Sequence, residues 1–207
     1  MKPSALKVGV DVPWVTSWSA EEIVGVRPCP TVGGDLALVQ TSNAGFGKPQ
    51  YSKNHLVRQR LTVRRMLCPM CGEPTPPDDR WTQVARLTPA GLLRRGGKAA
   101  DLSREIEDRR VVLDAGSIAP LHKACVDRSL MHCPHLKADP NVNVMRFPER
   151  WTLLPLLIEA APQVEAGGMA AAGAVLVVTF LQLVGITGRI DKDWRFRKLP
   201  PPVPHGG

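Results

Sequence analysis

Three signatures of enzymes are missing from this 207-residue sequence. No G-x-S-x-G motif places a serine nucleophile on a tight turn. The segment GGKAAD at 96–101 has glycines and a lysine, but it lacks the rest of a phosphate-binding loop. The few serine, histidine and aspartate residues form no recognisable catalytic set. We therefore expect a protein without enzymatic activity, and no small-molecule substrate is evident.

The N-terminal region also lacks a long apolar stretch, because Met1 to Ser4 lead into short mixed segments. We therefore expect no secretory signal. The five cysteines are an odd number. They fit a reducing compartment such as the cytoplasm, in which a Cys-x-x-Cys pair indicates metal or redox chemistry.

Acidic residues are absent between Asp35 and Glu73. The whole chain has a formal net charge of +8 and a pI near 9.6, which favours an anionic partner. Nucleic acid is the first candidate, followed by a membrane surface or an acidic protein, whereas the alternative is a merely solvated basic face. A short helix is predicted over 55–67. Six bases in the span are the predicted contacts: Lys48, Lys53, Arg58, Arg60, Arg64 and Arg65.

Two cysteine-containing pairs predict a structural zinc site. Cys68-x-x-Cys71 followed by Gly72 is typical of a zinc knuckle, a tight turn whose backbone amides face two sulfurs. His122 and Cys125 are three residues apart, so they share one face if a helix begins there. A knuckle facing a helix N-terminus is the treble-clef arrangement, and its expected ion is Zn²⁺.

Alternative ligands follow the second pair. If 122–133 is helical, Cys133 lies about 12 Å from Cys125 along the axis at ~1.5 Å per residue. Because a Zn–S bond is about 2.3 Å long, Cys133 is expected to pack in the core instead. A set that includes Cys133 or His135 stays open only if the helix starts later or breaks. A redox role for Cys68 and Cys71 is disfavoured, because the glycine and prolines that follow them prevent a helix.

The stretch RQRLTVRRMLCPMCGEP and the later LHKACVDRSLMHCPHL resemble uncharacterised proteins of actinobacteria and their phages. Those proteins have a basic run, a Cys-x-x-Cys-Gly-x-Pro knuckle, a paired-cysteine turn and a Cys-Pro-His-Leu ending. The resemblance covers roughly residues 50–136, with His122 in place of the usual cysteine. It implies a zinc-binding protein of phage or mobile-element type in a bacterial cell, and it supplies no activity.

A nuclease of the HNH type is a further alternative, because such enzymes use treble-clef zinc sites. They need a histidine pair or an Asp-His pair between the zinc halves to bind a catalytic metal. No histidine occurs between Cys71 and His122. The sequence therefore predicts that this zinc site is a structural scaffold and not a catalytic centre. For the function of the whole protein, the main rival to nucleic-acid binding is a virion-associated or other protein-interaction module.

An uncharged apolar run spans 166–188. It is long enough to cross a bilayer, but Gly and Ala dominate its first half and Gln182 interrupts the second. The bases after it would hold the tail in the cytoplasm and leave the zinc site outside. We favour a buried helix over a membrane anchor.

The expected fold is a small α+β domain with a treble-clef-like zinc centre, short antiparallel strands and this C-terminal apolar helix. The predicted organisation is a zinc-centred domain over 1–163, the apolar helix over 164–190 and a disordered proline-rich tail over 199–207. A charged helical stretch is also expected over 101–110.

Overall fold

A computed structural model describes residues 2–97, 99–140, 142–160 and 175–198 of the chain. Within them the fold is mixed α+β and most strand pairs are antiparallel. The strands are β1 (Thr16–Trp18), β2 (Ile23–Pro28), β3 (Leu36–Gln40), β4 (Pro49–Asn54), β5 (Trp81–Thr82), β6 (Arg86–Pro89), β7 (Arg110–Asp114), β8 (Met145–Arg146), β9 (Arg150–Ala160) and β10 (Val175–Ile190). The helices are α1 (Leu56–Arg65), α2 (Ala90–Arg95), α3 (Lys123–His132) and α4 (Pro134–Ala138), with short 3-10 turns η1 (Pro30–Val32), η2 (Pro77–Asp79) and η3 (Trp194–Phe196).

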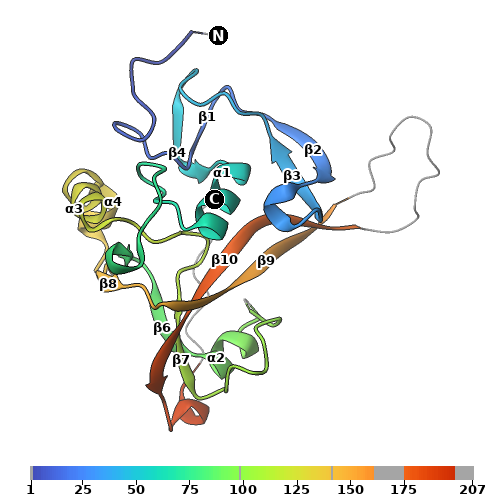
Figure 1. Ribbon diagram of the computed structural model, residues 1–207, viewed down its shortest axis with the longest axis vertical. Coiled ribbons are helices and arrows are strands. Elements are labelled where there is room, and N and C mark those ends of the chain that lie inside the picture. The colour runs from blue at the N-terminus through green and yellow to red at the C-terminus, as the bar shows by residue number, and fades with distance from the viewer. Residues whose placement is uncertain (1, 98, 141, 161–174, 199–207) are drawn as a thin grey trace.

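The largest sheet is built around β10, which is its longest strand (Figure 1). One edge of β10 pairs along its length with β9, and the two strands form a long antiparallel ribbon. The other edge pairs first with β3, in parallel, and then with β7, in antiparallel orientation. β2 extends the sheet beyond β3, and β6 extends it beyond β7. A single strand therefore links the two ends of the molecule.

The apolar run that we predicted as a helix is this central strand, so that prediction is wrong over 175–188. Leu181 to Gly185 are consecutively buried, which means that side chains on both faces of the strand are covered. A strand covered on both faces shows no alternation of polar and apolar residues, so by length alone it resembles a helix. Residues 166–174 of the run, and the tail 199–207, lie outside the described residues. No helix within the described part of the chain is both long enough and apolar enough to span a membrane.

The predicted helix over 55–67 is confirmed as α1, which lies against β10 and β3. His55 caps its first turn, since the imidazole Nδ1 accepts a hydrogen bond from the Arg58 backbone N–H at 3.2 Å. Val63 and Met66 pack with Ala37 and Leu183 of the sheet in the main core. This contact places the residues that follow α1, which hold the first two cysteines, beside the sheet.

A smaller unit holds the second pair of metal-ligand candidates. β5 pairs with β8, and an isolated bridge joins Trp81 to Leu121 just before α3. Its core is small, with Cys68, Leu121 and Val126 buried at the centre. Between Trp81 and Leu121 the chain forms β6 and β7, which belong to the large sheet, and the short helix α2. The 101–110 stretch that we expected to be helical consists of turns leading into β7, so that prediction is also wrong.

Candidate metal centre

The first half of the centre is a tight turn after α1. Gly72 N–H donates to the Cys68 carbonyl at 2.8 Å, and Cys68 N–H donates to the Glu73 carbonyl at 2.7 Å. Gly72 has a φ of +86°, which a residue with a side chain adopts only with strain. A Cβ on Gly72 would also lie 2.8 Å from the Trp14 ring. Glycine is therefore needed here both for the turn and for the packing of Trp14.

The second half is the start of α3. His122 is the N-cap residue and has extended backbone, and Cys125 lies one turn later. The side chain of Asp79 replaces the missing cap hydrogen bond, because its Oδ1 accepts from the Lys123 N–H at 2.8 Å. The Trp81–Leu121 bridge fixes this helix start next to the cysteine turn. The two pairs of candidate ligands thus come together from segments about 50 residues apart.

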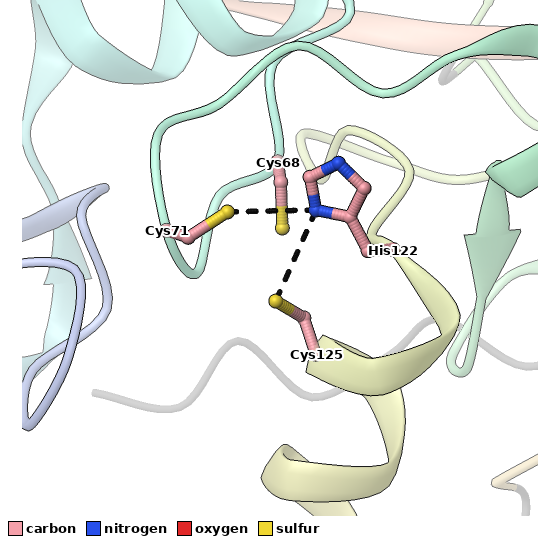
Figure 2. A group of neighbouring side chains, drawn as sticks. All are labelled: Cys68, Cys71, His122 and Cys125. Carbon is pink, nitrogen blue, oxygen red and sulfur yellow. Dashed lines mark hydrogen bonds between the residues drawn. The ribbon is translucent and has the colours of Figure 1, made fainter.

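The four candidate ligands point into one small space, as Figure 2 shows. Their ligand atoms all lie within 4.8 Å of one another. His122 Nδ1 is 3.5 Å from Cys71 Sγ and 4.0 Å from Cys125 Sγ. In a tetrahedral zinc site with bonds of about 2.3 Å to sulfur, neighbouring ligand atoms are roughly 3.5–3.8 Å apart. The cluster is therefore compatible with one metal ion of this size.

A hydrogen bond to a backbone carbonyl determines which ring nitrogen of His122 is available to bind a metal. Its Nε2 lies 3.0 Å from the Pro74 carbonyl oxygen, which can only accept a hydrogen bond. Nε2 therefore carries the hydrogen, and Nδ1 directs its lone pair at the three sulfurs. Such a partner on the far ring nitrogen is the usual support of a metal-binding histidine. Pro74 is the proline that follows the Cys-x-x-Cys-Gly turn, so the sequence motif includes this residue as well.

Burial and mutual proximity make two thiols of the cluster hold their protons more tightly than an ordinary cysteine does. Burial raises the pKa of the Cys68 thiol, and the neighbouring Cys71 adds to the effect. Burial, together with Cys68 and Cys71, raises the pKa of Cys125 to about 12. Three thiolates therefore repel one another in this space unless a positive charge compensates them. A metal ion bound here must displace protons from the thiols, which makes its affinity depend on pH.

The other cysteines and histidines considered as ligands lie elsewhere. Cys133 ends α3 and is half-buried, while His135 is exposed in α4. The metal-compatible group within the described residues consists of the four side chains above and includes neither of them. Cys29 is buried in the main core, where its sulfur lies 3.1 Å from the Thr31 hydroxyl and 3.7 Å from the Arg60 guanidinium.

The six bases that we predicted as an anion-binding set divide into two groups. Lys48 just before β4 and Lys53 on β4 are exposed, as are Arg64 and Arg65 at the end of α1. Arg58 and Arg60 are buried, with 6% and 0% of their surface exposed. The prediction that these two arginines contact a partner is wrong, because α1 is enclosed by the sheet and the N-terminal strands. The sequence pattern predicted a helix with basic residues, but it could not show which sides of that helix are covered by the rest of the fold.

The two buried arginines have internal partners. Arg58 forms a two-pronged ion pair with Glu21, at 2.6 and 2.8 Å. Arg60 donates to the Thr31 hydroxyl at 2.9 Å and to the carbonyls of Leu38 and Thr179 at 2.9 and 2.6 Å. It therefore ties α1 to β3 and β10. Glu21 was not considered at the sequence level, because the pair joins residues 37 apart in the chain and no local pattern indicates it.

Comparisons with models of protein families, with curated proteins and with solved structures gave no match to this chain. The site must therefore be interpreted from its own geometry.

Proposed function

We propose that Cys68, Cys71, His122 and Cys125 bind one structural Zn²⁺ in a treble-clef-like centre. The cysteine turn would be the knuckle, and the start of α3 would supply the other two ligands. The observation that supports this most strongly is the convergence of three sulfurs and one oriented imidazole nitrogen within 4.8 Å. Four protein ligands complete the tetrahedron that zinc prefers, which leaves no position for water or substrate. The ion would act as a scaffold.

We further propose that the protein is a non-enzymatic binding protein whose partner is nucleic acid. The exposed bases Lys48, Lys53, Arg64 and Arg65 lie in the acid-free span 36–72, close to the metal centre in sequence. Lysine and arginine side chains that neutralise phosphates release counterions, so binding should weaken steeply with salt and depend little on sequence. An acidic protein could pair with the same four bases, but its carboxylates would lack the regular spacing of the phosphates in nucleic acid.

A salt titration of binding tests this proposal. The affinity for a labelled duplex would be measured by fluorescence anisotropy at several salt concentrations, for the wild type and for a variant with Lys48, Lys53, Arg64 and Arg65 changed to Gln. The slope of log affinity against log salt should fall by about 0.9 for each phosphate contact removed. The matched control is Lys137→Gln, an exposed base on α4. Absence of binding at low salt would exclude the nucleic-acid partner.

A second candidate is a protein-interaction or virion-associated structural module. Exposed apolar side chains on the β9–β10 ribbon favour it, namely Leu157, Ile158 and Leu176. In that case the chain would bind no nucleic acid at low salt and would associate through the ribbon. Metal-dependent cleavage of nucleic acid by the folded protein would instead point to a nuclease.

A further inference from the structure

A second basic surface lies at the other end of β10 from α1. In Figure 1, η3 and α2 are both at the end of the molecule where β10 ends and β7 begins. The segments 86–110 and 189–198 contain twelve lysines and arginines against six acidic residues. Their excess of six positive charges is most of the net charge of +8 of the whole chain. The acid-free span is therefore not the only concentration of positive charge.

A buried arginine makes this end of the fold rigid. Arg94 of α2 is 8% exposed. It donates to the carbonyls of Leu102 at 3.0 Å and Ser103 at 2.6 Å, and it also forms an ion pair with Asp108. These bonds wrap the chain after α2 around one guanidinium. The turns over 101–110 are thereby held in place without helical hydrogen bonds.

The 3-10 turn η3 packs directly on α2. A Cβ on Gly91 would lie 2.5 Å from the Trp194 ring, so the indole rests against the glycine backbone. The Arg95 guanidinium carbon lies 4.8 Å from the centre of the Trp194 ring, and that of Arg195 lies 5.7 Å from it. Both distances fit cation–π contacts. One indole therefore fixes two exposed arginines at the surface.

Both arginines keep their hydrogen-bond donors free of acidic partners. Three of the nearby acids are engaged by other arginines: Asp108 by Arg94, Asp191 by Arg197 and Glu107 by Arg109. Within the described part of the chain, Arg95 and Arg195 form no ion pair. Next to them Phe196 is 87% exposed. We name Arg95, Trp194, Arg195 and Phe196 the basic platform.

We propose that the basic platform binds single-stranded nucleic acid, with Phe196 stacking on a base and with Arg95 and Arg195 contacting phosphates. This inference rests on the proposed nucleic-acid function and adds a strand preference and a surface. An exposed aromatic ring beside arginines offers a stacking surface next to phosphate donors, which is how single strands are bound without sequence preference. A duplex keeps its base faces stacked inside, so it could use only the arginines.

The test compares a single strand with a duplex on the same variants. An oligothymidylate of about 16 nucleotides and a duplex of equal length are titrated with wild type, Phe196→Ala and the double variant R95Q/R195Q. Phe196→Ala should weaken single-strand binding about fivefold or more and leave duplex binding within twofold. The double variant should reduce the single-strand salt slope by about 1.4, or 0.7 for each phosphate. Phe46→Ala is the matched control, because Phe46 is another exposed phenylalanine (43%) in the N-terminal part of the fold.

The outcomes separate this inference from the function on which it rests. If the wild type binds the oligonucleotide and Phe196→Ala binds it equally well, the basic platform is excluded while the nucleic-acid function stands. Equal weakening of single strand and duplex by Phe196→Ala would also overturn the stacking role. If binding is lost only in the variant with Lys48, Lys53, Arg64 and Arg65 changed to Gln, and not in the basic-platform variants, the interface lies at the α1 end of the molecule. If the wild type binds neither ligand, both proposals fail.

Discussion

The buried ion pair between Glu21 and Arg58 gives the sharpest test of which arginines are structural. Each carboxylate oxygen of Glu21 accepts two hydrogen bonds. Oε1 accepts from Arg58 Nη1 at 2.6 Å and from the Asn43 N–H at 3.2 Å. Oε2 accepts from Arg58 Nη2 and from the Trp18 N–H, both at 2.8 Å. Four donors thus converge on one carboxylate whose side chain is fully buried.

The substitution Glu21→Gln keeps the shape of the side chain and removes one of the two acceptor oxygens. The new amide group would face two N–H donors, and the charge of Arg58 would stay buried without a counter-ion. Removing one partner of a buried ion pair costs about 3–5 kcal/mol of the free energy of unfolding. For a chain of about 200 residues this corresponds to a decrease in Tm of roughly 6–20 °C, at about 2–4 °C per kcal/mol.

Thermal and urea unfolding of zinc-saturated protein would measure this difference. The matched control is Glu22→Gln, since Glu22 is the adjacent glutamate and is exposed. An exposed substitution of this kind should change the free energy of unfolding by no more than about 0.5 kcal/mol. If Glu21→Gln and Glu22→Gln unfold at the same midpoint, Arg58 is not held inside the fold and the division of the six bases is wrong.

Three further outcomes are expected. Gly72→Ala should destabilise more than Gly97→Ala in urea unfolding, because both glycines have positive φ but only Gly72 is crowded, by the Trp14 ring; equal losses would contradict the packing argument. Burial, with the charges of Arg58 and Arg60, lowers the pKa of His55. As the pH falls, His55 is therefore protonated in the unfolded chain before it is protonated in the folded one. This favours unfolding, so His55 should lower the stability as the pH drops below about 6.5. In the variant His55→Asn, the urea midpoint should change less between about pH 7 and 5. Chelation should speed amide exchange at 68–74 and 121–126 while β9 and β10 stay protected, whereas uniform protection with and without chelator would argue against a structural metal.

The sequence allowed the metal-ligand candidates to be predicted, because ligand chemistry restricts spacing. Cys68 and Cys71 need only a local turn, and that turn is encoded by Gly72. His122 and Cys125 need only the start of a helix. The orientation of His122 was not predictable, because it depends on the Pro74 carbonyl, and no pattern states which backbone oxygen faces a ring.

The central strand and the buried arginines were missed for a related reason. β10 is covered on both faces, so its sequence lacks the alternation that identifies a strand. Arg58 and Arg60 are enclosed because the N-terminal strands and the sheet both contact α1, and these contacts join residues far apart in the chain. Local patterns therefore predicted α1 well, and they failed where tertiary contacts decide which side chains reach the surface. The five bases after the apolar run 166–188 were noted only for their charge, although Trp194 and Phe196 lie among them.

Metal content is the measurement that tests the central claim most directly. Protein purified without added metal would be analysed for zinc as the wild type and as Cys68→Ser, His122→Ala and Cys133→Ser, with circular dichroism to confirm that each variant is folded. The proposed zinc centre predicts about one zinc per chain in the wild type and in Cys133→Ser, and a large loss in Cys68→Ser and His122→Ala. Full zinc retention in Cys68→Ser, or loss of zinc in Cys133→Ser alone, would contradict the proposed centre.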